Sequence, residues 1–207
     1  MAETNTPTTA PAAKSTIGLR NFVIAPVTSD TVAGTTYGTL QLVAGAIEAS
    51  TTPNNTDPDI QYADDIEFDV VNKDPDITFK IKLVDVPLSI QAMLLGAVLD
   101  DNGVMVNSAS DQSPYFAVGF KSEKSDHTFR YVWLYKVRAK PITDNYASEQ
   151  GATITRQNPE VEFTAIKRTY DGRWRVIADE GQNGFTSEMA ATFLTSVYEP
   201  EITPPTP

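Results

Sequence analysis

The sequence lacks several residues and patterns on which protein chemistry often depends. It contains no cysteine, which excludes disulfide bonds, thiolate metal sites and cysteine nucleophiles together. It contains a single histidine, His127. No apolar run approaches the roughly 20 residues needed to span a bilayer. The N-terminus has neither a basic segment nor an apolar core, so we expect no signal peptide, and a cytosolic origin fits these absences.

These absences leave few arrangements for catalysis. His127 has no second histidine for a metal and no Ser–Asp partner, so we expect an exposed turn residue rather than a catalytic base. The phosphate-binding patterns GxxxxGK[ST] and GxGxxG do not occur in the sequence. We therefore predict that the protein is not an enzyme, and assign no catalytic, cofactor-binding or metal-ligating residue and no cofactor.

Carboxylates alone leave an enzymatic alternative open. A glycosidase needs two carboxyl groups about 5 to 10 Å apart across a cleft, and no aromatic cluster accompanies the acids here. Neighbouring aspartates could also ligate Ca²⁺, but the spacing of a calcium-binding loop is absent. The candidate acids are Asp64, Asp65, Glu67 and Asp69, and Asp100 with Asp101.

The charge is acidic overall and unevenly spread. The formal net charge is −11. Residues 1–72 hold nine acids and two bases, whereas residues 119–175 hold eleven bases and seven acids. Tight binding to nucleic acid needs a clustered positive face, which this distribution opposes. It is compatible with contact between acidic and basic surfaces of two copies, and, more simply, with an ordinary solvated surface.

Both ends of the chain have the composition of flexible segments. Residues 1–16 are nearly all Thr, Ala, Pro, Ser and Asn, and the last residues are rich in proline. Neither stretch has the apolar area to offset the entropy lost on ordering. We predict a flexible N-terminal arm at 1–16, a folded domain at 17–198 and a flexible tail at 199–207.

Alternation of apolar and polar residues predicts strands over most of the folded domain. A long loop is expected at about 51–59, where Pro, Asn and Asp gather. The turn signal Asp171-Gly172 predicts a hairpin between the last two strands. The expected strands cover residues 19–27, 39–50, 66–71, 77–84, 161–168 and 173–178.

Two segments have the apolar spacing of helices. The first, at about 87–99, has an apolar stripe that includes Ile90 and Leu94. Asp85 can cap it, and Gly96 could end it early. A second helix is expected at about 187–198. The predicted fold class is mainly β, a β-sandwich or curved antiparallel sheet with one packed α-helix.

A hairpin of aromatic and basic residues is the most informative stretch. We expect strands at 115–121 and 127–138 around a polar turn at 122–126. Rings and positive charges also occur together in platforms for single-stranded nucleic acid, but here they fall on opposite faces, which favours core packing. One face holds Phe129, Tyr131, Trp133, Tyr135 and Val137, and the other Arg130, Val132, Leu134, Lys136 and Arg138. The candidate core residues are Phe79, Ile81, Ile90, Met93, Leu94, Tyr131, Trp133, Tyr135 and Trp174.

Several motifs, in their order along the chain, are similar to a known family. They are Tyr62-Ala-Asp-Asp65, Leu94-Leu-Gly96 followed by Asp101-Asn-Gly-Val104, the hairpin from Pro114 to Arg138, and Tyr170-Asp-Gly-Arg-Trp174. From about Gly18 to about Asp179 the chain resembles the major tail (tail tube) proteins of long, non-contractile-tailed (siphovirus-type) bacteriophages. Many relatives carry an additional immunoglobulin-like decoration domain, which we expect to be absent here.

The resemblance implies a structural protein of the virion tail that assembles in the host cytoplasm. Family members have a β-sandwich with a flanking helix and stack as hexameric rings, whose inner sheets join edge to edge into a barrel. DNA passes through this tube as a transient passenger. The implied partners are further copies of the chain, the tape-measure protein, and the terminator and distal tail proteins that cap the tube.

The resemblance also implies a negatively charged bore to which DNA does not adhere. We select Asp64, Asp65, Glu67 and Asp69 as candidate lumen-facing acids, although an ordinary solvent-facing strand and turn would explain them equally well. The candidate basic face, which would contact acids of a neighbouring copy, consists of Lys121, Lys124, Arg130, Lys136, Arg138 and Lys140.

Two other functions remain open from the sequence. One is a soluble β-sandwich binding module or another ring-forming virion protein, such as a tail terminator, baseplate component or adhesin. Such a protein would stay a monomer or a single closed ring. The other is a hydrolase with a pair of acids, which would lose activity after an Asp→Asn change while remaining folded.

Overall fold

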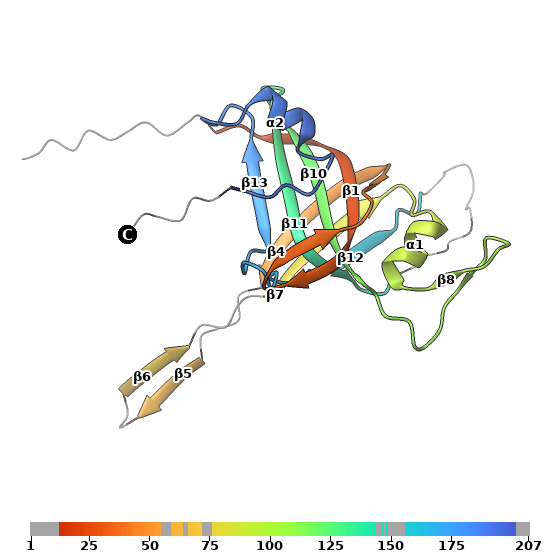
Figure 1. The fold of residues 1–207 in the computed structure, drawn as a ribbon, viewed down its shortest axis with the longest axis horizontal. Coiled ribbons are helices and arrows are strands. Elements are labelled where there is room, and N and C mark those ends of the chain that lie inside the picture. The colour runs from red at the N-terminus through yellow and green to blue at the C-terminus, as the bar shows by residue number, and fades with distance from the viewer. Residues whose placement is uncertain are drawn as a thin grey trace, which may run out of the picture.

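The structure, a computed structural model, describes residues 13–54, 59–63, 66–71, 76–143, 146, 148 and 156–201. This part of the chain is mainly β, with an antiparallel main sheet and two short helices, which confirms the predicted fold class (Figure 1). The strands of the main sheet are β1 (Thr16–Thr31), β2 (Gly34–Tyr37), β3 (Gln41–Val43), β4 (Ala46–Asn54), β7 (Asp76–Leu83), β10 (Tyr115–Lys124), β11 (Phe129–Ala139), β12 (Glu160–Ala165) and β13 (Arg175–Asp179). Two small hairpins, β5 (Asp59–Ala63) with β6 (Ile66–Val71) and β8 (Val98–Leu99) with β9 (Met105–Val106), and the helices α1 (Leu88–Leu95) and α2 (Ser187–Thr192) complete it.

The predicted aromatic hairpin, β10 with β11, forms the centre of the main sheet. Its first strand is longer than expected, because residues up to Lys124 pair with the start of β1. The turn is correspondingly short and is closed by a hydrogen bond from the Lys124 N–H to the Thr128 carbonyl. The strands then follow in the order β2-β1-β10-β11-β12-β7-β4.

A bulge in β11 changes which side chains share a face. Phe116 pairs with Val137 and Val118 pairs with Leu134, so two residues of β11 lie opposite the single Ala117. The extra residue reverses the alternation beyond the bulge. Val137 therefore packs with Leu134, and its predicted place on the aromatic face is wrong.

The outer edge of β11 is shared by two strands placed end to end. β13 pairs with residues 130–134 of β11, and β12 pairs with residues 137–139. The hairpin predicted around Asp171-Gly172 is therefore wrong, because these two strands pair with β11 rather than with each other. The turn itself forms, with the Gly172 N–H donating to the Arg168 carbonyl.

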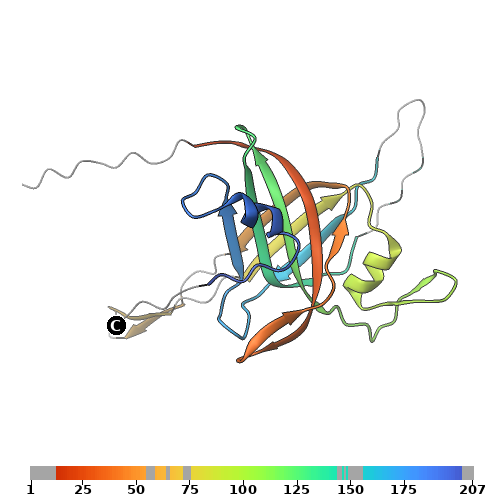
Figure 2. The same ribbon diagram turned by 45° about the horizontal axis from the view of Figure 1, so that its top comes forward.

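The sheet curls back on itself through β3 and β4. β3 pairs with β1, and β4, which begins after only two intervening residues, pairs with β7 at the far end of the strand order. The single strand predicted at 39–50 is therefore two strands separated by a corner. The ribbon views show β1, β10 and β11 lying across β4, β7 and β12 (Figures 1 and 2).

Two hydrophobic clusters lie on opposite faces of the central hairpin. The first cluster fills the space between the crossed strands and packs against α1, and it contains Phe79, Ile81, Ile90 and Leu94 in buried positions, with Met93 and Trp174 partly buried. The second cluster lies under α2 and the residues after it, and contains Tyr131, Trp133, Tyr135 and Phe193. β11 is therefore covered on both faces.

Both helices end before their predicted limits. α1 stops at Leu95, because Gly96 adopts a left-handed conformation (φ 73°) that closes the helix. Its first turn has no side-chain cap, so the expected cap from Asp85 is not made. α2 stops at Thr192 rather than near residue 198, because the carbonyl of Phe193 accepts a hydrogen bond from the Trp133 indole (2.8 Å).

The loop predicted at 51–59 is also shorter than expected. β4 continues to Asn54 because it stays paired with β7 as far as Asp76, and residues 55–58 lie outside the described part of the chain. The chain then forms the β5–β6 hairpin, which stands apart from the main sheet in both views (Figures 1 and 2). No helix among the described residues is long and apolar enough to cross a membrane.

Candidate assembly surfaces

β4 presents one unpaired edge at the end of the main sheet. It pairs with β7 along its length, and no other described strand pairs with it. Pro53 and the register shift between Ala46 and Glu48 blunt the two ends of this edge. The central part has neither device. An unpaired edge of this length is a template for pairing with another chain.

One face of the β4–β7–β12 part of the sheet is polar. On β7, core residues alternate with Thr78, Lys80 and Lys82, which are partly exposed. Lys80 Nζ lies 3.3 Å from Glu162 and 3.4 Å from Glu160 across the ladder to β12. These hydrogen bonds raise the pKa of Lys80. A hydrogen bond from Lys140, followed by that from Lys80, lowers the pKa of Glu162, so the charges on this face are largely matched.

Two of the candidate lumen-facing acids, Glu67 and Asp69, belong to the β5–β6 hairpin rather than to the main sheet. Glu67 and Asp69 lie on β6, where their backbones pair with Tyr62 and Gln61. Asp64 and Asp65 lie outside the described residues. Whether these acids face a bore is therefore a question of where the hairpin lies in an assembly, and their role stays a prediction.

The six basic candidates contact groups of their own chain. Lys124 and Arg130 contact Asp179. Lys136 contacts Asp30 at 2.6 Å, and Lys140 contacts Glu162. Arg138 donates to the Ser113 carbonyl (2.7 Å), and Lys121 Nζ lies 4.4 Å from the centre of the Phe129 ring. Contacts of these bases with a neighbouring copy stay a prediction.

Asp179 fixes the end of β13 against β10 and β11. Arg130 donates two hydrogen bonds of 2.7 Å to its carboxylate, and Lys124, which is buried, lies 2.9 Å away. The hydrogen bond from Arg130, with that from Lys124, lowers the pKa of Asp179 to about 2. The adjacent Glu180 accepts from the Tyr131 hydroxyl at 2.7 Å.

A second ion-pair network holds the residues after α2 against the sheet. We call residues 193–201 the C-terminal strap. The side chain of Arg168 is fully buried and contacts the carboxylates of Asp171 and of Glu199, which belongs to the strap. The guanidinium also donates to the Tyr37 hydroxyl at 3.1 Å and lies 3.9 Å from the centre of the Tyr135 ring. Glu199, assigned from the sequence to a flexible tail, is therefore held in place.

The partners of Arg168 determine its protonation. Burial by itself would lower the pKa of Arg168, but hydrogen bonds to Glu199, Asp171 and Tyr37 outweigh it and raise the pKa above its usual value. Burial raises the pKa of the Tyr37 hydroxyl to about 12, against the opposing effect of Arg168. Arg168 therefore stays charged and holds Asp171 and Glu199 against the sheet.

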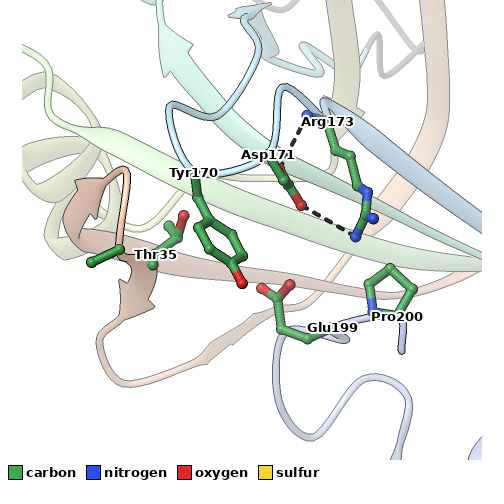
Figure 3. Close-up of a pocket in the computed structure, with 8 residues that line it drawn as sticks. Thr35, Tyr170, Asp171, Arg173, Glu199 and Pro200 are labelled. Atoms are coloured by element: carbon green, nitrogen blue, oxygen red, sulfur yellow. Dashed lines mark hydrogen bonds and ion pairs between the residues drawn. The ribbon is translucent and has the colours of Figure 1, made fainter. Parts of the chain in front are cut away.

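An open pocket of about 540 Å³ lies beside this network (Figure 3). Its walls come from the β1–β2 turn, the turn after β12 and the strap. Figure 3 shows Tyr170 and Glu199 reaching into the same space, while Arg173 turns toward Asp171, with 3.2 Å between its guanidinium and the carboxylate. Because the pocket is open and its charged groups are paired, it does not resemble a preorganised catalytic site.

Asp30 ties the β1–β2 hairpin to the same region. Its carboxylate accepts hydrogen bonds from Lys136 and from the Thr169 N–H (2.9 Å). Burial would raise the pKa of Asp30, but these bonds lower it well below its usual range. Lys136 can reach Asp30 because it lies in the β11 bulge, so the bulge directs a charged side chain into this network.

The other candidate residues contact groups close to them in the sequence. His127 is exposed in the β10–β11 turn and its ring lies 3.0 Å from Glu123. Asp100 accepts from the N–H groups of Asn102 and Val104 and so closes a turn, which lowers its pKa. The described residues contain no group of three or more His, Cys, Asp or Glu side chains placed to hold a metal ion.

The sequence reasoning missed the Arg168 network. The only local signal was an arginine three residues before Asp171, because Tyr37 and Glu199 are distant in the sequence.

A comparison with known protein families identifies the family of the chain. The model of the family described as phage tail tube protein matches residues 12–198, and a comparison with curated proteins gives no match. Since the family match covers most of the sequence, from the N-terminal residues to the strap, this chain belongs to the phage tail tube proteins.

Proposed function

We propose that this structural tail protein works by polymerising into stacked rings, six copies to a ring, which form the hollow tube through which phage DNA passes. The observation that carries the proposal is the unpaired edge of β4 beside the polar face of β4, β7 and β12. In a chain of the tail tube family, this edge supplies the hydrogen-bonding groups with which one copy joins the next.

The polar face is our candidate for the wall of the bore. The opposite face of these strands packs into the first cluster. The central hairpin has a hydrophobic cluster on each of its two faces, so it leaves no comparable polar face. A bore for DNA needs a hydrated surface without clustered positive charge, because unpaired lysines would retain phosphates. The carboxylates of Glu160 and Glu162 pair with Lys80, and Lys82 lies opposite Glu48 and Glu160 in the strand register.

The β5–β6 hairpin would then extend from the end of β4 toward a neighbouring copy or ring. Its position after the edge strand makes it a suitable contact between rings, and the acids Asp64, Asp65, Glu67 and Asp69 remain candidates for the lumen on that basis. As a tail tube protein the chain resides in the virion tail. Assembly in the host cytoplasm, around a tape-measure protein and between end-capping tail proteins, is part of the proposal.

Electron microscopy tests the proposal directly. Purified protein, imaged by negative stain over rising concentration and with tail-tip proteins added as initiators, should form hollow tubes of constant width. The double variant Ser50→Lys/Thr52→Lys, which places charge on the open strand, should form few tubes. Ser125→Lys in the exposed β10–β11 turn is the matched control and should assemble normally. Protein that stays monomeric under every one of these conditions would overturn the proposal.

A further inference from the structure

The segment after α1 forms an ordered arm. We call residues 97–111 the apolar arm. At its base, a Cβ atom on Gly96 would lie 2.3 Å from the carbonyl oxygen of Gln112, so the two ends of the arm meet at a contact that only glycine permits. At its tip, Asp100 accepts from the N–H groups of Asn102 (2.9 Å) and Val104 (2.8 Å). The arm is therefore fixed at both ends and projects from the body (Figure 1).

The apolar side chains of this arm face solvent. Val98 pairs with Val106 across β8 and β9, and these two side chains are 65% and 54% exposed. Val104, at the end of the turn, is 55% exposed. A two-stranded hairpin is marginally stable by itself in water. The hairpin nevertheless keeps its valine side chains exposed to solvent. Exposed apolar side chains of this kind indicate a surface that binds another molecule.

A second apolar surface lies at the start of α1. Two adjoining hollows, of about 460 and 230 Å³, share the residues Leu42 to Gly45 at the β3–β4 corner. We call them together the corner groove. Leu42 and Val84, which line it, are 65% and 57% exposed. Asn21, on its rim, has a left-handed backbone (φ 53°) at a bulge of β1, where the regular pairing with β10 is interrupted.

The charges of the arm and the groove are complementary. The arm carries Asp100, Asp101 and Asp111 and no basic residue. One end of the groove is lined by Arg20, whose side chain is 60% exposed although it contacts Glu123. The other end is lined by Asp85. An arm lying with its tip toward Arg20 would thus bring Asp100 and Asp101 to the positive end of the groove and keep these two acids away from Asp85.

We propose that the apolar arm of one copy inserts into the corner groove of the next copy. Within one chain the two surfaces lie at opposite ends of α1, and the arm projects away from the body, so the contact joins different copies. Because donor and acceptor surfaces differ, the contact is head-to-tail and generates a ring when its rotation closes. This inference rests on the proposed tube assembly and names a surface that holds neighbouring copies together.

Cross-linking tests the contact without interference, because the chain has no cysteine. Val106→Cys and Leu42→Cys variants, carrying tags of different size, are mixed and oxidised at high concentration. We expect a disulfide-linked heterodimer, and a ladder of longer products from the double variant. The control mixes Val106→Cys with Val32→Cys, an exposed position on the β1–β2 turn, and should give no heterodimer. If the unsubstituted protein forms tubes but the Val106→Cys and Leu42→Cys variants give no cross-link, the inference is overturned and the proposed function still stands.

A charge exchange provides the second measurement. Asp101→Arg should raise the concentration needed for assembly about tenfold, as should Arg20→Glu. The double variant should recover most of the loss, since the pair is restored between copies. A merely local effect of either substitution would not be rescued, and additive losses in the double variant would contradict the inference. Failure of the unsubstituted protein to form tubes, with the cross-link still present, would count against the proposed tube and not against this contact.

Discussion

The two short helices cover the sheet in opposite ways. Beneath α2, polar groups of the aromatic face are satisfied: the Trp133 indole donates to Phe193, and the Tyr135 hydroxyl donates to Tyr198. The rings of Phe193 and Tyr198 stack at 4.7 Å. Beside α1, in contrast, Leu88 is half exposed and the corner groove is open. The first region stabilises the single chain, and the second leaves apolar surface exposed.

The largest loss of stability is expected from removing the buried charge of Arg168, in the region covered by α2 and the strap. Arg168→Ala leaves Glu199 without its cation and Asp171 with Arg173 alone, and it removes a fully buried side chain, so we expect a loss of about 3–5 kcal/mol in the free energy of unfolding. Denaturant titration followed by fluorescence measures it. Arg173→Ala removes a partly exposed partner of the same Asp171 and should cost under about 1 kcal/mol. Equal losses for the two variants would show that the strap is not held by Arg168.

Close packing in the same region supplies the next test. Gly119 lies opposite Trp133 in the β10–β11 ladder, and a Cβ atom there would lie 2.8 Å from three atoms of the indole ring. Since Trp133 is fully buried, Gly119→Val should destabilise the protein by about 3 kcal/mol. Gly18→Ala, whose added atom meets its nearest neighbour at 3.6 Å, is the control. Thermal unfolding by circular dichroism measures both, and an unchanged melting temperature for Gly119→Val would contradict the packing.

Acid should loosen the same region through Asp179. Its pKa in the folded protein is about 2, lowered from 3.8, so the unfolded chain takes up the proton first as the pH falls. The stabilisation is complete above about pH 4 and is lost toward pH 2, a change of about 2 kcal/mol. The free energy of unfolding should therefore differ clearly between the protein and Asp179→Asn at pH 5, and this difference should shrink to about a third at pH 2.5. A constant difference between the two would rule out this linkage.

The smallest effect on stability is expected from a substitution on the exposed apolar arm. Val106→Ser changes an exposed side chain and should alter the free energy of unfolding by less than about 0.5 kcal/mol. The same variant should assemble poorly, because a valine buried between copies is lost. Denaturation and negative-stain microscopy of one preparation measure both properties. A large loss of stability would show that the arm supports its own chain, and would remove the contrast between the two regions.

The sequence predicted what depends on local alternation. The aromatic strand was found because Tyr131, Trp133 and Tyr135 recur at every second position, and their burial follows from that pattern. The bulge after Leu134 was not visible, because it depends on the register with β10 rather than on β11 itself. The apolar spacing at 187–198 predicts a longer helix than the one that forms, since the Phe193 carbonyl accepts a hydrogen bond from Trp133, a residue far away in the sequence.

The candidate surfaces were harder to foresee for the same reason. Motif similarity identified the family, and the match to residues 12–198 agrees with it. The basic residues of β11, however, were considered without their partners, and Asp30 and Asp179 reach them only through the fold. The corner groove could not be predicted at all, because it forms where β3, β4 and α1 meet.

The shared edge of β11 has a consequence for synthesis on the ribosome. The outer edge of residues 130–134 stays unpaired until β13, which ends at Asp179, has been synthesised. Until then a nascent chain presents an apolar strand with open hydrogen-bonding groups, the condition under which chains associate wrongly. Translation must therefore run some forty residues beyond β11 before the strand is closed, from Ala139 to Asp179. A pause within that interval would expose the centre of the fold when many copies are being made side by side.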